Sequence, residues 1–372
     1  MKFPYRCPDP ADAAAIDWAS FDAPWVAPMA ACPQDPEHHG EGDVWTHTKM
    51  VCEALVGLPA WRALAPGQRE LVFAAALLHD IAKPVCTTIE DGKIRQPGHS
   101  PRGASMVRAM LWREGVDPRR REAIAALIRY HQLPFFLIDA PDPTHRLAAL
   151  SQTARCDHLA LLTRADALGR ICRDLQRLLD NIDLFTELAA EHGCLQTPYQ
   201  FPSDHSRFLY FRDPHRDPHH HAFDDTRCEV VVMSGLPGSG KDHWIRHNLD
   251  LPEISLDGLR EALDVAPTDP QGAVIQAARE RAREHLRRGQ GFVWNATNLG
   301  RDMRKRIIDL CAAYGARVRI VYLEVPRRRL LQQNRARADV VPEQVLDRMA
   351  RIWEPPDHTE AHQVDWILDD SP

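Results

Sequence analysis

The stretch EVVVMSGLPGSGK at residues 229–241 decides the fold of the C-terminal part of this chain. Its first six residues form a short apolar run rich in β-branched side chains, which predicts a buried strand. The glycine-rich turn that follows matches the pattern G-x-x-x-x-G-K and leads into a predicted helix. Because this pattern binds nucleotide phosphates where it joins a strand to a helix, we predict a phosphate-binding loop here.

The predicted loop has the residues that a polyphosphate requires. Glycine lets the backbone turn tightly, so that successive N–H groups and the N-terminus of the next helix face the phosphates. Lys241 is expected to reach the β- and γ-phosphate oxygens. The expected cofactor is ATP or another NTP with Mg²⁺, and the predicted nucleotide-binding residues are Gly235, Pro237, Gly238, Ser239, Gly240, Lys241 and Asp242.

One position in this loop departs from the usual pattern. The residue after the lysine is commonly Ser or Thr, whose hydroxyl binds Mg²⁺, whereas this chain has Asp242. A carboxylate is a suitable hard ligand for Mg²⁺, but its charge also repels the phosphates. A third reading is an acid in the first turn of a helix, where the helix dipole favours negative charge.

Strands and helices alternate after the loop. Further strands are predicted at 252–255 (PEIS), 291–297 (GFVWNAT) and 317–325 (RVRIVYLEV), with helices between them. Alternation of this kind indicates a parallel sheet that is covered on both faces. We therefore predict an α/β P-loop NTPase domain over residues 228–372.

A phosphotransferase also needs a base near the acceptor hydroxyl and cations over the transferred phosphate. Asp257 follows the second predicted strand, at the sheet edge where open α/β folds bind ligands; the alternative is a helix N-cap. Arg335 and Arg337 are candidates for a lid over the nucleotide, or are surface arginines. Arg and Lys far outnumber Asp and Glu between residues 279 and 337, which favours phosphate contact over a merely solvated face.

Six pieces of this half resemble the P-loop polynucleotide kinases, which phosphorylate 5′-hydroxyl ends of RNA or DNA: GLPGSGKD, SLDGLR, VWNATNLGRDMRKRI, VYLEVP, QNRAR and VPEQVLDRM, within about residues 228–360. The resemblance implies that Asp257 is the general base. It also implies that Arg260 contacts the acceptor phosphate and that Arg335 contacts the donor phosphates, while Lys241 assists the transfer. Arg304, in the third piece, is predicted to contact the polynucleotide together with Arg260.

The N-terminal half is predicted to be all-α. Residues 1–43 are rich in Pro, Ala and Asp and are predicted to be irregular. Apolar residues recur at three- and four-residue spacing over 44–192, where no run predicts a strand. Residues 193–227 contain four prolines and a His-rich stretch and are predicted to be a linker, with the triplet His219–His221 in a solvated loop.

A set of histidines and aspartates on the predicted helices indicates a metal site. His79 and Asp80 end the apolar segment LVFAAALLHD, where an unpaired buried carboxylate would be costly. Metal coordination removes that cost, and catalytic sites hold the ion with a few N and O ligands on rigid elements. His47 and Asp166, on other predicted helices, complete the set. For any single histidine the alternative is an ordinary buried side chain.

The strings GDVWTHT and AALLHDIAKP resemble the HD phosphohydrolases, especially the HD domains appended to bacterial tRNA nucleotidyltransferases, over about residues 40–190. The resemblance implies one metal held by His47, His79, Asp80 and Asp166. A second would be held by His99 and His131, with Asp80 bridging, unless these are a surface-loop and a helix-end histidine. Lys83 is a candidate catalytic contact to the substrate phosphate, with Arg102 as a second candidate. Mixed His/carboxylate ligation suits Mn, Fe, Co, Ni or Zn.

Composition excludes some classes of protein. The 372 residues exceed what one core commonly supports, so two domains are expected. No apolar run is long enough to span a bilayer, and the first residues lack a secretory h-region. The nine cysteines include no CxxC pair, which favours reduced thiols. We expect a cytoplasmic protein with no membrane partner, and the net charge of −6 gives no global field for nucleic acid.

The order of the two halves resembles the bacterial HD-Pnk end-healing enzymes. That resemblance implies removal of 2′,3′-cyclic, 2′- or 3′-phosphates by the first domain and 5′-hydroxyl phosphorylation by the second. The expected partners are RNA or DNA ends, and a ligase acting downstream. Two alternatives remain: an HD nucleotidase fused to a small-metabolite kinase, and an NTP-binding sensor that regulates an HD phosphodiesterase.

Overall fold

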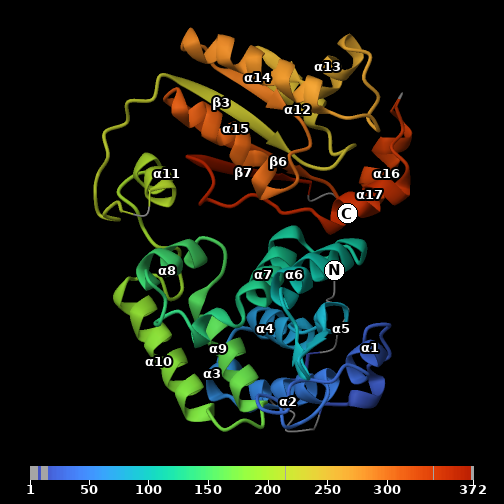
Figure 1. The fold of residues 1–372 in the computed structure, drawn as a ribbon, viewed down its shortest axis with the longest axis vertical. Helices are drawn as coiled ribbons and strands as arrows, with labels where there is room; N and C mark the ends of the chain where they lie inside the picture. The colour runs from blue at the N-terminus through green and yellow to red at the C-terminus, as the bar shows by residue number, and fades with distance from the viewer. Residues whose placement is uncertain (1–6, 10–15, 214, 338, 370–372) are drawn as a thin grey trace. The chain divides into compact units, whose positions relative to one another are not determined.

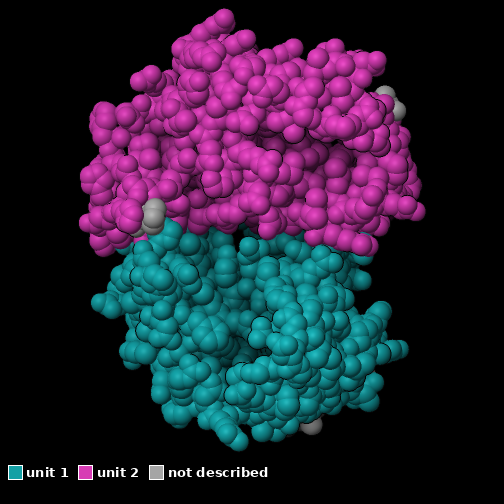
Figure 2. Space-filling model, viewed as in Figure 1, with its two compact units in different colours: residues 1–200 teal, residues 201–372 magenta. Residues whose placement is uncertain are grey.

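The computed structural model describes residues 7–9, 16–213, 215–337 and 339–369 and divides the chain into two compact units (Figures 1 and 2). Unit 1 comprises residues 1–200, and unit 2 comprises residues 201–372. The predicted segments 1–43, 193–227 and 228–372 each include positions outside the described residues. No helix in the described ranges is long and apolar enough to cross a membrane.

Unit 1 is helical, as predicted. Its helices are α1 (Val26–Ala30), α2 (Val44–Gly57), α3 (Pro59–Arg62), α4 (Pro66–Leu78), α5 (Lys83–Cys86), α6 (His99–Arg113), α7 (Pro118–Tyr130), α8 (Pro143–Ser151), α9 (Cys156–Leu168) and α10 (Leu175–Glu191), with 3-10 turns at Trp18–Ser20 and Leu133–Phe135. A small exposed hairpin, β1 (Thr88–Glu90) and β2 (Lys93–Arg95), is the one sheet of this unit among the described residues.

The helical pattern of residues 157–193 is broken between α9 and α10. Residues 169–174 separate the two helices, and they run close to α2. A side chain at Gly169 would approach the Val51 backbone N to 2.7 Å, so only glycine allows this proximity. The break therefore brings the C-terminal end of α9 against α2.

Unit 2 is an α/β domain whose five strands are all parallel in the order β4-β5-β3-β6-β7. Its strands are β3 (Cys228–Ser234), β4 (Glu253–Ser255), β5 (Phe292–Asn295), β6 (Ala316–Glu324) and β7 (Gln363–Leu368). Its helices are α11 (Asp204–Arg212), α12 (Lys241–Asn248), α13 (Leu256–Ala262), α14 (Gly272–Arg287), α15 (Arg301–Ala313), α16 (Arg327–Arg335) and α17 (Glu343–Arg351). Strand β7 is absent from the sequence prediction; it is a half-exposed edge strand interrupted by Asp365.

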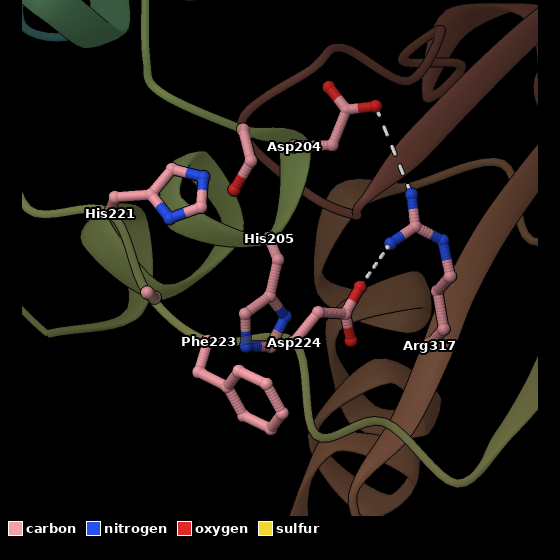
Figure 3. Close-up of a pocket in the computed structure, with 8 residues that line it drawn as sticks. Asp204, His205, His221, Phe223, Asp224 and Arg317 are labelled. Carbon is pink, nitrogen blue, oxygen red and sulfur yellow. Dashed lines mark hydrogen bonds and ion pairs between the residues drawn. The ribbon is translucent and has the colours of Figure 1, made fainter.

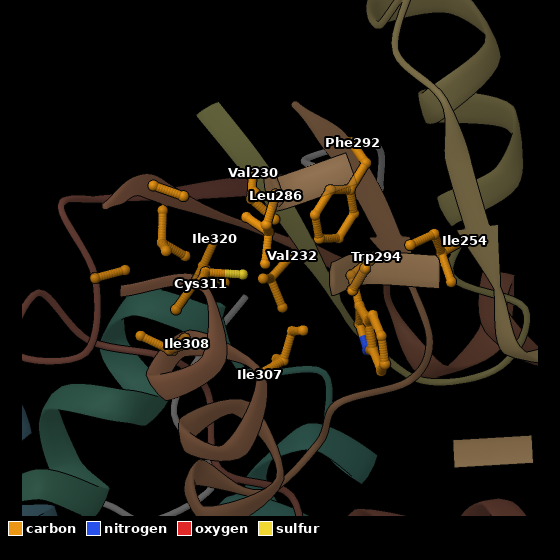
Figure 4. Packing of buried hydrophobic residues seen from close by; sticks show 14 of the residues in the cluster. Val230, Val232, Ile254, Leu286, Phe292, Trp294, Ile307, Ile308, Cys311 and Ile320 are labelled. Carbon is orange, nitrogen blue, oxygen red and sulfur yellow. The ribbon is translucent and has the colours of Figure 1, made fainter. Parts of the chain in front are cut away.

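Helices cover both faces of this sheet, because strand side chains alternate between them. On one face, Val230 and Val232 of β3 pack with α14 and α15 residues such as Leu286 and Ile307 (Figure 4). On the other face, Val231 and Met233 pack with Ile245 of α12. The P-loop that follows β3 therefore leaves the sheet from a strand buried on both sides.

The structure does not keep residues 193–227 as a separate linker. Residues 193–200 belong to unit 1, where the Asp157 N–H donates to the Leu195 carbonyl at 2.9 Å. In unit 2, Phe208 of α11 enters the core, and Arg207 donates to the carbonyls of His358 and His362. The prolines around these residues led the sequence analysis to predict a linker instead of a packed segment.

Beside the start of α11 lies a pocket that Figure 3 shows in close-up. Arg317 of β6 forms ion pairs there with Asp224, at 3.0 Å, and with Asp204, at 3.9 Å. His221 and Phe223 line the same pocket, so this part of the His-rich stretch packs against unit 2. The arginine is already neutralised, and the pocket lies at the start of β6, the opposite strand end from the P-loop.

Candidate active sites

The six predicted metal ligands come together in unit 1. His47 lies in α2, His79 and Asp80 follow α4, His99 begins α6, His131 follows α7 and Asp166 lies in α9. All six are buried. Residues far apart in the sequence thus converge because five helix segments meet at one point.

One part of this cluster surrounds oxygen Oδ2 of Asp80. Nε2 of His47 lies 3.1 Å from Oδ1 of Asp166 and 3.4 Å from Nε2 of His79. Nε2 of His79 lies 3.2 Å from Oδ2 of Asp80. These four side chains are the set that the sequence predicts for a first metal.

The other oxygen of Asp80 faces the remaining histidines. Oδ1 lies 3.4 Å from Nε2 of His99 and 3.8 Å from Nε2 of His131. The two carboxylate oxygens therefore point to different groups of ligands, as a bridging carboxylate requires. This arrangement matches the predicted second site.

The donor set fits a pair of divalent ions. Neither Asp80 oxygen meets hydrogen-bond geometry with any described residue, although the Lys83 ammonium lies 2.7 Å from Oδ2 as an ion pair. Two atoms at about 2.1 Å from one ion are about 3.0 Å apart at an octahedral angle and about 3.4 Å apart at a tetrahedral angle. The observed spacings lie near these values, so residues in these places suit N/O coordination by transition metals.

Backbone carbonyls orient the histidines. Nδ1 of His79, His99 and His131 each lies 2.8 Å from the carbonyl oxygen three residues earlier, at Ala76, Gln96 and Ile128. A donated Nδ1–H fixes the tautomer in which Nε2 carries the free lone pair. All three Nε2 atoms are thereby prepared to bind a metal.

Charged neighbours keep the two carboxyl groups ionised. Burial by itself raises the pKa of Asp80. The nearby charges, first those of His79 and Lys83, lower this pKa by more than burial raises it, so it lies well below its ordinary value. Burial likewise raises the pKa of Asp166, but Arg170 and the nearby histidines together lower it well below its ordinary value. The guanidinium of Arg170 donates to both Asp166 oxygens, at 3.0 and 2.7 Å. Arg170, four residues after Asp166, was missed in the sequence, although that spacing on a helix could have indicated it.

Three further residues of this site come from the segment predicted to be irregular. Glu41 lies 2.9 Å from Nδ1 of His47 and 2.8 Å from Nδ1 of His39, and Gln34 accepts from the Lys83 ammonium at 2.6 Å. Nothing in the local pattern of residues 1–43 distinguishes these polar side chains from others. Of the two candidate contacts to the substrate phosphate, Lys83 is buried inside the site, whereas Arg102 is exposed.

In unit 2, the glycines of the P-loop form a tight turn. Gly235, Gly238 and Gly240 all have positive φ, and a side chain at Gly235 would approach the Leu323 carbonyl oxygen to 2.5 Å. Pro237 and Ser239 are buried within the loop. Helix α12 begins at Lys241, directly after the loop, so its N-terminus faces the enclosed space.

Lys241 folds back over this loop. Its ammonium donates to the carbonyls of Gly235, at 3.0 Å, and Leu236, at 3.1 Å. Burial lowers the pKa of Lys241 to about 8. Phosphate oxygens would replace these carbonyls as partners and restore the ordinary charge preference.

Asp242 and Asp257 border the same sheet edge. Asn295, at the end of β5, donates to the carboxylate of Asp242 in the first turn of α12 at 2.7 Å. Asp257 lies in the first turn of α13 and pairs with Arg260, whose Nε donates to Gln271 at 2.7 Å. The N-cap of α13 is Ser255. The alternative role that the sequence allowed for Asp257, that of a helix N-cap, is therefore excluded. Its carboxylate is 78% exposed and accessible to a substrate.

The predicted role of Arg304 in binding a polynucleotide is wrong. Its side chain is fully buried, pairs with both oxygens of Glu360 at 2.8 Å, and donates to the carbonyls of Asn298, Leu299 and Glu354. No nitrogen remains available to a substrate, so this arginine joins α15 to the chain around residues 354–360. The sequence could not distinguish it from its exposed neighbours.

The two lid candidates differ in their surroundings. Arg335 is 72% exposed and pairs with Glu343 at 3.0 Å. Arg337 is half-buried, and its charge lies near enough to Lys241 to lower the pKa of that lysine. The Asn334 side chain donates to the Val341 carbonyl and accepts from the Val341 N–H. These two hydrogen bonds anchor the loop that carries Arg337.

Comparisons with known families agree with this division. Residues 44–171 match the family model of the HD domain, and residues 230–356 match a family model described as an AAA domain. The chain thus joins a segment similar to HD domains to a segment similar to AAA domains.

Among curated proteins, the chain is similar to the multifunctional CCA proteins of Halorhodospira halophila and Cupriavidus metallidurans. The first is 32% identical over 29% of this chain and 24% of its own length; the second is 31% identical over 37% and 32%. The chain therefore spans about a third or less of the length of these relatives. A gluconokinase from Sinorhizobium meliloti is a similar solved structure, at 19% identity over 39% of this chain and 84% of that chain, with a TM-score of 0.30.

Proposed function

We propose that this chain repairs both ends of a broken nucleic acid strand. Unit 2 would transfer a phosphate from an NTP to a 5′-hydroxyl end. Unit 1 would remove a 2′,3′-cyclic phosphate, or a 2′- or 3′-phosphate, from the other end. The observation that carries the proposal is a buried cluster of histidines and aspartates around Asp80, which could hold metal ions, on the same chain as a glycine-rich P-loop. On one shared phosphate the two activities would cancel, whereas on opposite ends they complement each other.

The kinase half has a residue for each step. Asp257, in the first turn of α13, accepts the proton of the 5′-hydroxyl as the hydroxyl oxygen attacks the γ-phosphorus. The bond between that phosphorus and the β,γ-bridging oxygen breaks, and the NDP leaves. Lys241 and the P-loop N–H groups neutralise the charge on the phosphates. Arg260, held by Gln271, is placed beside Asp257 to bind the acceptor phosphate.

In the hydrolase half, bound metal ions would supply an activated water and neutralise the phosphate oxygens. The residues that would hold them are His47, His79, Asp80, His99, His131 and Asp166. Lys83, buried at 2.7 Å from Asp80, would bind the substrate phosphate from the protein side. The product ends, a 5′-phosphate and a 3′-hydroxyl, are those that a ligase joins.

One assay tests both halves. An RNA with a 5′-hydroxyl and a 2′,3′-cyclic phosphate is incubated with the full chain, ATP, Mg²⁺ and Mn²⁺, and each end is analysed separately. We expect phosphate transfer to the 5′ end and release of phosphate from the 3′ end. Labelling of a free nucleoside but not of the RNA would contradict the kinase half.

Two variants separate the halves. Asp257→Ala should abolish 5′ transfer but retain 3′ release, with Glu261→Ala, an exposed acid on the same helix, as its control. His79→Ala should abolish 3′ release but retain 5′ transfer, with the exposed His38→Ala as its control. Loss of both activities in His79→Ala would mean that the cluster is structural rather than catalytic.

A further inference from the structure

The segment 33–43 packs against the metal cluster of unit 1, yet it precedes the matched HD domain, which begins at residue 44. It is fastened at several points. Gly40 N–H donates to the Ile171 carbonyl at 2.9 Å, and Pro33 and Asp43 form a β-bridge. A side chain at Gly40 would lie 3.0 Å from the Ile171 carbonyl oxygen, so the approach is close. We name residues 33–43 the strap.

Glu41 is the buried centre of this strap. Its side chain is 1% exposed, and three nitrogens face it: Nδ1 of His39 at 2.8 Å, Nδ1 of His47 at 2.9 Å as an ion pair, and the backbone N–H of Ile171, at 2.9 Å from Oε2. A buried carboxylate with this many donors is fully compensated. Its contact with His47 is the one that reaches the cluster.

We propose that Glu41 is a positioning residue for His47, a proposal that rests on the metal site of the proposed function. By accepting the Nδ1–H of His47, the carboxylate fixes the tautomer in which Nε2 carries a free lone pair. That atom is the one that lies 3.1 Å from Asp166 and 3.4 Å from His79. Carboxylate–histidine pairs of this kind orient the ligand ring and increase its basicity.

The other histidines of the cluster do not depend on such a carboxylate. His79, His99 and His131 are each oriented by a carbonyl at 2.8 Å, whereas Nδ1 of His47 lies 3.2 Å from the Gly169 carbonyl oxygen and 2.9 Å from Glu41. Glu41 is therefore specific to the part of the cluster that contains His47. The ion held by His99 and His131 should not depend on it.

The test is metal binding by Glu41→Gln, measured without any substrate. Glutamine keeps the shape but replaces one acceptor oxygen by an NH₂ donor, so either the two histidines at Oε1 or the Ile171 N–H at Oε2 lose their acceptor. We expect the wild-type chain to bind two Mn²⁺ ions per chain, counted by the loss of the free-ion EPR signal. In Glu41→Gln one ion should keep its affinity, while the other should bind about 10- to 100-fold more weakly.

Two controls distinguish positioning from general damage. Glu37→Gln makes the same change at an exposed position of the strap and should bind both ions like the wild type. The unfolding of metal-free Glu41→Gln, followed by circular dichroism, shows whether the strap still packs. Equal weakening of both ions, or wild-type binding of both, would overturn the proposal. A wild-type chain that binds no Mn²⁺ would overturn the hydrolase function itself, together with this inference.

Discussion

The Asn295 side-chain nitrogen donates to Asp242 at 2.7 Å and to Glu253 at 2.7 Å, so one amide joins two carboxylates beside the P-loop. Asp242 occupies the position where a hydroxyl commonly binds Mg²⁺. Held in this way, its carboxylate adds a negative charge that attracts the cation and repels the phosphates.

We therefore expect Asp242→Ser to raise the Mg²⁺ concentration for half-maximal kinase activity by roughly tenfold, about 1.4 kcal/mol. The same variant should bind ATP more tightly than the wild type when Mg²⁺ is absent. Mg²⁺ titrations of kinase activity and calorimetry with EDTA measure the two effects. Glu253→Gln is the control, because it removes the other acid that shares Asn295. An unchanged Mg²⁺ requirement would show that Asp242 is only a first-turn acid.

The lid arginines should differ in importance. Arg337 lies near Lys241 and has no ion-pair partner among the described residues, whereas Arg335 is exposed and paired with Glu343. A cation over the transferred phosphate strongly accelerates phosphoryl transfer. We expect Arg337→Ala to lower kcat/KM of the kinase by at least about 100-fold and Arg335→Ala to lower it only a few-fold. The opposite order in steady-state kinetics would restore the role that the sequence predicts for Arg335.

Arg304 should matter for stability rather than for substrate binding. Removing one partner of a buried ion pair leaves an uncompensated charge, at a cost of about 3–5 kcal/mol. We expect Arg304→Leu to reduce the free energy of unfolding of unit 2 by this amount in urea titrations. The double variant Arg304→Leu with Glu360→Leu should recover part of the loss, because no charge then remains unpaired. A large rise in KM for RNA without loss of stability would contradict this assignment.

Acid should destabilise unit 2 through His362. Nδ1 of this buried histidine accepts from the Val318 N–H at 3.0 Å, and burial lowers its pKa to about 3. Between pH 3 and pH 6.5 the unfolded chain therefore binds more protons at this residue than the folded chain does. Stability falls as pH falls through this range, by at most about 1.4 kcal/mol per pH unit.

His362→Asn tests this assignment, because the asparagine oxygen can still accept from Val318. We expect urea midpoints measured from pH 7 to pH 4.5 to depend less on pH in this variant than in the wild type. Exposed His247→Asn serves as the comparison. Parallel pH profiles for His362→Asn and the wild type would show that His362 does not govern acid stability.

By itself, the sequence determined the two classes of fold and the residues whose roles follow from local spacing. The P-loop glycines and the His79–Asp80 pair are recognisable because their chemistry depends on neighbours a few residues away. The six His and Asp residues predicted as ligands do lie together around Asp80. Coordination of a metal by them stays a prediction, as do the cytoplasmic location and the nucleic acid partners.

Only the tertiary structure decided what each charged residue contacts. Glu41 accepts from the backbone N–H of Ile171, which lies 130 residues away in the sequence, and no local pattern encodes that approach. Arg304 and Arg335 look alike in sequence, yet one is buried in an ion pair and the other is exposed. Burial and pairing set the energy of a charge, and both depend on the packing of distant segments.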